Sequence, residues 1–238
     1  MRNFSVFFLF LTCVLLVFPQ TMNAQSGKFE IGISTGGTIN KLHTKTIRSY
    51  SKYESEGGFS VSIPMQYLFL NWLAVRLDLS CLQKNYTWSH NTWNKEIFVT
   101  QTTQNTYIQI PLLLHFSLGK KRFKVFANAG GFGGYLVHRK AKGSVSNIFD
   151  ILNSYNYKEK SEFDKRKDQR FEFGLATSLG LEYFIKNQYR IFIEARYFYA
   201  CTDLQKEYMI NQIPRYNDTF LFQAGCLFNL SNIKNSKK

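Results

Sequence analysis

Residues 171–183 read FEFGLATSLGLEY, and nearly every second residue of this stretch is large and apolar. Successive side chains of a β-strand point to opposite faces of a sheet, so the pattern predicts a strand with two different faces. The second face carries Glu172, Gly174, Ala176, Ser178, Gly180 and Glu182. These residues are mostly too small for a surface washed by water, which normally carries long charged side chains. They suit the crowded interior of a small β-barrel.

The same alternation recurs along the rest of the chain. Eight runs show it, over residues 29–33, 59–67, 73–81, 108–116, 123–136, 171–183, 191–199 and 220–230. The fifth run is rich in glycine, and its phase is ambiguous. The connections are alternately short, near 70–72, 118–120 and 186–188, and long, around 38–57, 86–104, 138–168 and 200–217. Short turns on one side and long loops on the other are typical of outer-membrane barrels.

The sequence therefore predicts an all-β fold: an eight-stranded antiparallel up-and-down transmembrane β-barrel with short periplasmic turns and four long extracellular loops. We expect the barrel in an outer membrane. The composition of 45% hydrophobic and 17% aromatic residues excludes intrinsic disorder. A mean hydropathy of -0.23 excludes a polytopic helical membrane protein, but not a barrel in which only alternate residues meet lipid.

The two ends of the chain differ from the alternating part. A basic start, an apolar run from Phe4 to Phe18 and a small residue at Ala24 predict a secretory signal peptide over 1–24. The barrel domain is expected over 25–230, followed by a basic periplasmic tail over 231–238. Three cysteines remain after cleavage, Cys81, Cys201 and Cys226, which allow one disulfide at most.

Alternation alone does not say which face points outward. A soluble lipocalin-like barrel has the same period with its apolar face inside, and a sandwich buries that face between two sheets. In a membrane, the opposite phase of the seventh run would aim Glu194 and Arg196 at lipid, where an Arg at the midplane costs about 2–4 kcal/mol. We therefore expect the charged residues to pair in the lumen, because an unpaired buried charge is costly. The candidates for lumen ion pairs are Glu30, Arg76, Asp78, Arg170, Glu172, Glu182, Glu194 and Arg196.

We interpret these candidates as a structural plug, with a proton or ion path as the alternative. Gly130-Gly131-Phe132-Gly133-Gly134 is not followed by a helix, as a phosphate-binding loop requires, so these glycines are expected to make room for a neighbouring ring or to bend the sheet. No spacing of His and Cys predicts a metal site. No cofactor is expected.

Two segments resemble a known family. Residues 107–116, YIQIPLLLHF, resemble the Y-[LI]-E-[IL]-P-L-L-L-K-[YF] strand of PorT-family outer-membrane β-barrel proteins of Bacteroidota. Residues 129–136, AGGFGGYL, are similar to the A-G-P-[YF]-x-G-Y-L segment of that family, with Gly131 where proline is usual. Further similar segments lie in the last three runs. The resemblance implies a protein of the outer membrane of a Gram-negative bacterium. The name-giving member is linked to type IX secretion, and no catalytic residues come with the family.

One motif suggests an enzyme. His115 and Ser117 have the His-x-Ser spacing of some outer-membrane lipid A deacylases, but the pair falls at a predicted periplasmic turn, away from outer-leaflet lipid. We therefore expect no enzyme, and keep a lipid-modifying enzyme as the alternative to a structural, binding or secretion-accessory role through the long loops.

The net charge of +14 is concentrated outside the runs, above all in residues 139–167. The expected partners are the lipid bilayer, lipopolysaccharide phosphates and proteins of the cell envelope, and not nucleic acid. A merely solvated basic loop is the simpler interpretation.

Overall fold

The computed structural model describes residues 28–44, 51–91, 97–120, 122–147, 155–160, 163–164, 168–185, 188–206 and 214–230. The predicted signal peptide and the basic tail lie outside these residues. The strands are β1 (Lys28–Thr44), β2 (Ser51–Leu68), β3 (Leu73–Gln83), β4 (Tyr86–Asn91), β5 (Ile97–Lys120), β6 (Phe123–Asn147), β7 (Tyr155–Lys160), β8 (Phe171–Ile185), β9 (Tyr189–Ala200) and β10 (Arg215–Asn229).

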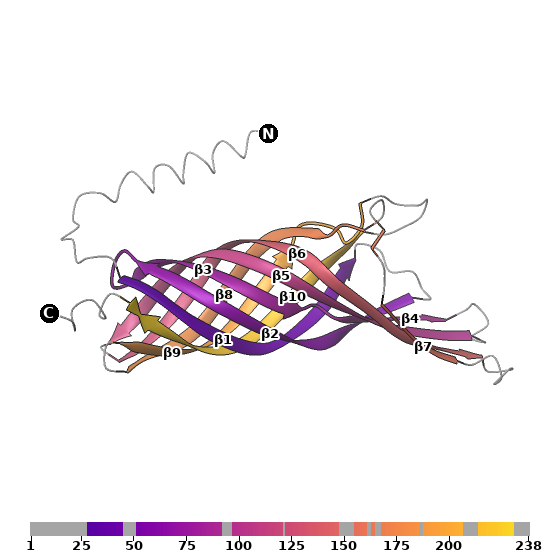
Figure 1. Cartoon of the computed structure of the whole chain (residues 1–238), viewed down its shortest axis with the longest axis horizontal. Helices are drawn as coiled ribbons and strands as arrows, with labels where there is room; N and C mark the ends of the chain where they lie inside the picture. Colours follow the sequence, from indigo (N-terminus) through magenta and orange to yellow (C-terminus); the bar gives the residue numbers. More distant parts are fainter. Residues whose placement is uncertain are drawn as a thin grey trace.

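Within the described residues, eight of these strands close a ring in the order β1-β2-β3-β5-β6-β8-β9-β10. All pairings are antiparallel, and β1 closes the ring on β10 with Ile33 opposite Cys226. The start of β1 and the end of β10 lie at the same end of the barrel as the short turns (Figure 1). This arrangement confirms the predicted up-and-down barrel.

The strands continue well beyond the length that a bilayer requires. A membrane strand needs about 9–11 residues, whereas β5 has 24 and β6 has 25. At the end opposite the short turns, β4 fills the space between β2 and β5, and β7 adds to the edge of β6 (Figure 1). We call this sheet of β4, β7 and the adjoining ends of β2, β5 and β6 the extension.

The extension corrects the prediction that 38–57, 86–104 and 138–168 are loops. Much of each segment is strand, because these residues are rich in Thr, Ser and Tyr, which favour pleated structure. They are also polar, so they break the apolar alternation that marked the eight runs, while their backbone groups still pair across the hairpins.

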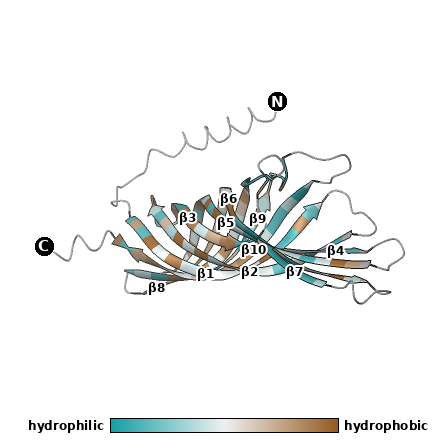
Figure 2. Cartoon of the chain, turned by 45° about the vertical axis from the view of Figure 1, so that its right-hand side comes forward, coloured by the Kyte–Doolittle hydropathy of each residue, from teal (hydrophilic) through white to brown (hydrophobic). Residues whose placement is uncertain are grey.

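The apolar face of the barrel points outward. Leu112 is 55% exposed and its neighbour Leu113 is 1% exposed, and the same contrast runs along the other strands. Hydrophobic positions accordingly recur along the barrel strands in Figure 2. In the glycine-rich part of β6, up to Leu136, the even-numbered residues face inward, since Phe126, Phe132 and Leu136 are buried. This orientation excludes the lipocalin-like alternative.

Aromatic side chains border the apolar surface near the short turns. The exposed members there are Phe29, Tyr67, Phe69, Trp72, Phe116, Phe123, Tyr183, Tyr189 and Phe228. Such girdles mark the interfaces of membrane barrels. Cys81, Cys201 and Cys226 are all free thiols. No helix among the described residues is long and apolar enough to span a membrane.

Candidate functional site: a lumen filled with ion pairs and rings

Four charged side chains meet in the middle of the lumen. Arg76 contacts Asp78 at 2.8 Å and Glu194 at 3.2 Å, and Arg196 contacts the same two acids at 2.7 and 2.8 Å. All four side chains are at most 1% exposed. Two guanidinium groups and two carboxylates balance each other, so this central quartet carries no net formal charge. Alternation places its members, since Arg76 and Asp78 are two residues apart on β3, and Glu194 and Arg196 two apart on β9.

Amides add further hydrogen bonds to the quartet. Gln223 donates to Glu194 at 2.8 Å, and Asn128 donates to Glu194 at 3.1 Å and to Ser178 at 2.8 Å. Ser34 in turn donates to Gln223 at 3.2 Å. Buried charges are tolerated where such bonds satisfy their remaining lone pairs and protons. The quartet and these side chains therefore link six strands of the ring: β1, β3, β6, β8, β9 and β10.

A second cluster lies towards the short turns. Arg190 donates to Glu182 at 2.9 Å and contacts Glu30 at 2.7 Å. The Nε2 atom of His115 lies 3.8 Å from Glu182, and its Nδ1 atom lies 2.8 Å from Asn128 Oδ1. This cluster is therefore linked to the central quartet through Asn128.

A third cluster lies towards the extension. Lys84, which is fully buried, donates a hydrogen bond to Glu172, and Asn217 donates to the other carboxylate oxygen of Glu172 at 2.6 Å. The Nζ atom of Lys84 also lies 4.8 Å from the centre of the Phe132 ring and 5.2 Å from that of Tyr107. Cation–π attraction of this kind is strongest where water is excluded.

Buried rings occupy the spaces between the three clusters. Phe126 and Phe192 pack edge to face with 6.4 Å between centroids, and Phe132 and Phe198 do so at 5.2 Å. The guanidinium of Arg76 lies 4.8 Å from the centre of the Phe192 ring. Charged and aromatic layers thus alternate along the lumen, as expected for a cylinder with room only for its own side chains.

Seven of the eight predicted lumen residues belong to these clusters: Glu30, Arg76, Asp78, Glu172, Glu182, Glu194 and Arg196. Arg170 does not. It is half-buried at the rim, where its Nε donates to the Leu136 carbonyl at 3.0 Å and its guanidinium lies over the rings of Tyr135 and Phe163. Among the described residues it forms no ion pair, because it precedes the first residue of β8 and turns towards β6.

Sequence reasoning missed two lumen cations, Lys84 and Arg190. Both have the inward phase of their strand: Lys84 continues the series of Arg76 and Asp78, and Arg190 that of Glu194 and Arg196. They lie just outside the apolar runs from which the strands were predicted. Continuing the run 73–81 by three residues reaches Lys84, and extending the run 191–199 by one residue towards the N-terminus reaches Arg190.

His115 and Ser117 are both buried and inward-facing, yet the structure does not join them in a catalytic pair. The two ring nitrogens of His115 face Asn128 and Glu182, and Ser117 lies 3.5 Å from Lys124 Nζ. In the part of the chain that the structure describes, no group of three or more metal-ligating side chains occurs.

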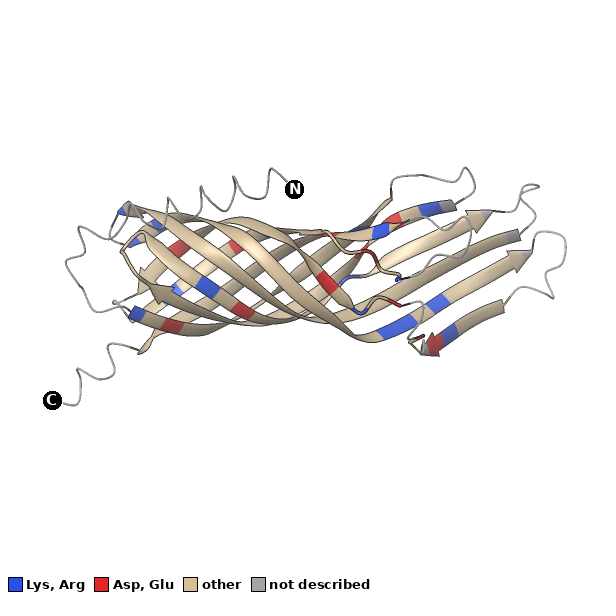
Figure 3. Ribbon diagram, turned by 90° about the horizontal axis from the view of Figure 1, so that it is seen from above, with Lys and Arg blue, Asp and Glu red and all other residues tan. Residues whose placement is uncertain are grey.

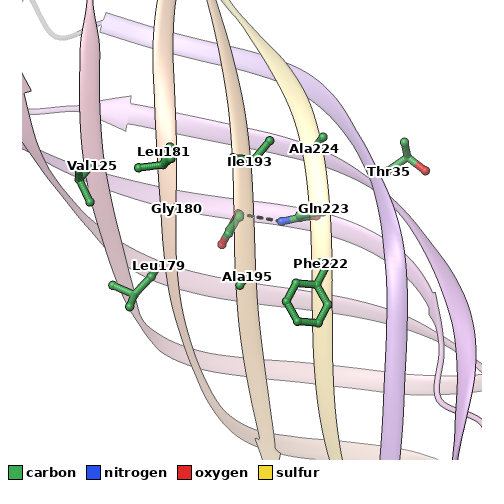
Figure 4. Close-up of a pocket in the computed structure, with 11 residues that line it drawn as sticks. Thr35, Val125, Leu179, Gly180, Leu181, Ile193, Ala195, Phe222, Gln223 and Ala224 are labelled. Carbon is green, nitrogen blue, oxygen red and sulfur yellow. Dashed lines mark hydrogen bonds between the residues drawn. The ribbon is translucent and has the colours of Figure 1, made fainter.

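The outer wall carries a shallow apolar groove of about 680 Å³ across β6, β8, β9, β10 and β1. Figure 4 shows the small side chains of Ala195 and Ala224 near the larger Phe222, with Leu181 on one side of them and Thr35 on the other. The hydrogen bond from Gln223 to Glu194 lies directly behind this wall. Charged residues of both signs occur along the barrel strands and on the extension (Figure 3).

A family model agrees with this architecture. A family model described as "Outer membrane protein beta-barrel domain" matches residues 23–206. No match was found among curated protein sequences. Among solved structures, the chain is similar to outer membrane protein OprG from Pseudomonas aeruginosa, with 12% identity, coverage of 86% of this chain and 96% of that chain, and a TM-score of 0.47. It is also similar to Outer Membrane Protein W from Escherichia coli, with 12% identity, coverage of 88% and 100%, and a TM-score of 0.46.

Proposed function

Since this chain belongs to the outer membrane protein beta-barrel domain family, we propose that it is a closed, non-conducting scaffold of the outer membrane that acts by binding through its extension. The barrel contacts the lipid bilayer of a Gram-negative outer membrane. The observation that carries the proposal is the central quartet: Arg76, Asp78, Glu194 and Arg196 meet at contact distance across the middle of the lumen, with rings packed on both sides. A solute would have to break these contacts to pass.

Single-channel recording in planar bilayers tests this function. We expect the purified full-length protein to insert without producing steady conductance steps, whereas an open porin inserted under the same salt and voltage conducts. Insertion is verified by heat-modifiable migration of the protein recovered from the bilayer lipid. A stable pore of the wild-type protein would contradict the proposal, because it would require a water-filled path beside the quartet.

We also propose that the barrel is not an enzyme. The alternative, hydrolysis of envelope lipid by His115 and Ser117, is disfavoured because His115 is held by Asn128 and both residues are buried at the short-turn end. The test is the lipid A composition of a strain that carries His115→Ala in place of the wild-type protein. An unchanged composition supports the proposal, and an accumulated substrate refutes it.

The resemblance of residues 107–116 and 129–136 to the PorT family supports a finer assignment. These segments lie side by side on β5 and β6, with Leu112 opposite Gly131. We propose that the chain is a PorT-type barrel of Bacteroidota, exported by a signal peptide, and that its extension serves an accessory role in the envelope, with lipopolysaccharide as its nearest partner. N-terminal sequencing of the mature protein from native membranes tests the export step, with a start at Gln25 expected.

A further inference from the structure

Lysines lie directly opposite one another where β6 and β7 pair in the extension. Lys142 is opposite Lys158, and Lys140 is opposite Lys160 in the register of the two strands. The side chains of Lys140, Lys142 and Lys158 are exposed. We call these three side chains the lysine strip. Like charges directly opposite each other destabilise an antiparallel pair of strands. A bound anion would reduce this repulsion between the lysines of the strip.

The acidic residues nearest in sequence do not relieve it. Glu159 is opposite Ala141 and therefore lies on the other face of the sheet, and Asp168 is bound by Arg139 at 2.7 Å. Among the residues that the structure describes, no ion pair of the lysine strip is formed. Other lysines at the end of the barrel opposite the short turns have acidic neighbours. Lys52 contacts Glu54 at 2.6 Å, and Lys41 is opposite Asp218.

A β-bulge determines which way the strip points. In the lower part of β6 the even-numbered residues face the lumen, as Leu136 does. Between Thr106 and Tyr107 the register with β5 shifts, so that Tyr107 is opposite Leu136 but Thr106 is opposite His138. The extra residue reverses the phase, and a bulge is a common device for redirecting a side chain. Above it, Arg139 faces inward to donate to Asn105, and Lys140 and Lys142 face outward.

The strip stands beyond the outer border of the apolar surface, on the side of the outer-leaflet headgroups. Tyr135, whose ring packs on Phe171 at 4.9 Å, stands at the upper border of the apolar surface. Lys140 and Lys142 follow it by five and seven residues. With a rise of about 3.3 Å per residue and a tilt of about 40°, this places them roughly 12–18 Å beyond that border. Their flexible stems can reach back towards the lipid phosphates.

We propose that the lysine strip binds the phosphate groups of lipopolysaccharide in the outer leaflet. The inference rests on the proposed function, since it requires the extension to lie outside the membrane on the extracellular side. Lysine ammonium groups are compact charges that bind phosphate without a fixed bidentate geometry. Phosphates bound over the exposed face of the paired strands cancel the repulsion of Lys142 and Lys158. They also anchor one side of the extension to the membrane surface.

The test measures binding of fluorescent bis-phosphorylated lipid A to the full-length protein in neutral micelles at low salt. The strip variant combines Lys140→Gln, Lys142→Gln and Lys158→Gln. The matched control combines Lys41→Gln, Lys52→Gln and Lys120→Gln, which removes the same formal charge elsewhere. Because all these side chains are on the surface, both proteins should keep the heat-modifiable migration of the wild type, which is checked first.

We expect the strip variant to bind bis-phosphorylated lipid A about a hundredfold more weakly, at roughly fivefold per lysine near an anionic surface, and the control to change less than threefold. Removing the phosphates from lipid A should weaken binding to the wild type but not to the strip variant. Equal losses in both variants, or equal wild-type binding of dephosphorylated lipid A, would overturn the proposal. A strip variant that loses binding to heparin but not to lipid A would also overturn it, in favour of a soluble polyanion. A conducting pore would refute the proposed closed scaffold. It would not change what these binding results say about the lysine strip, so the two proposals can fail separately.

Discussion

Phe192 lies directly opposite Gly225 in the β9–β10 ladder, and a Cβ atom on Gly225 would come within 2.7 Å of the Phe192 ring. Phe132 and Gly174 are related in the same way across β6 and β8. Ring and glycine thus form cross-strand pairs inside the barrel, which lets a large side chain lie flat in a narrow lumen. The aromatic layers therefore require glycine at these inward-facing positions opposite a ring.

Gly225→Ala should lower the free energy of unfolding by about 1–3 kcal/mol, because overpacking forces the ring and backbone to shift. Gly133→Ala is the matched control, since its added Cβ would meet its nearest neighbour, the Phe173 ring, at 3.7 Å. Urea unfolding in lipid vesicles measures both. Equal stability of the two variants would show that the lumen has spare room beside Phe192.

Arg76→Met should destabilise the barrel by about 3–5 kcal/mol, because it leaves Asp78 and Glu194 with one guanidinium between them. Adding Asp78→Asn to this variant removes one of the two carboxylates and should recover part of the loss. The same unfolding experiment gives the coupling energy from the two single variants and the double variant. Strict additivity would mean that the two side chains do not interact in the folded barrel.

Lys84→Met should also destabilise the barrel strongly, since it leaves the buried carboxylate of Glu172 without its cation. The double variant with Glu172→Gln should be more stable than Lys84→Met alone, because a glutamine oxygen can still accept the hydrogen bond from Asn217. Thermal loss of heat-modifiable migration is a suitable measure. A double variant that is less stable than the single one would contradict this pairing.

Ile193→Arg should cost about 2–4 kcal/mol, because Ile193 is 55% exposed on the apolar outer wall and charge is costly at the bilayer midplane. Thr100→Arg lies on the extension and should change stability by less than about 0.5 kcal/mol. Folding yield into vesicles and urea unfolding report both effects. If both substitutions were tolerated equally, the outer wall at Ile193 would be in water.

The period of two made most of the barrel predictable, because a one-residue error in phase would have aimed Glu194 and Arg196 at lipid. This period could not predict features that depend on contacts between residues far apart in the sequence. The phase of β6 depends on Phe126 and Phe132 finding room against Gly180 and Gly174, which no local pattern reveals.

The extension was harder to predict for a related reason. Strands of the extension have no bilayer on one face, so nothing enforces an apolar alternation there, and they resembled loops. Lys84 and Arg190 were missed because they stand just beyond the apolar runs, and Arg170 was misplaced because its partners, Leu136 and Phe163, come from other segments.

Nuclear magnetic resonance of two adjacent leucines, Leu112 and Leu113, tests the outward apolar face most directly. The wild-type protein carries protonated Leu methyl groups in an otherwise deuterated chain and is placed in protonated lipid nanodiscs. We predict nuclear Overhauser effects from lipid acyl chains to the Leu112 methyl groups and none to those of Leu113, which pack inside the lumen. Acyl-chain contacts to Leu113 with none to Leu112 would contradict the outward apolar face and with it the filled membrane barrel.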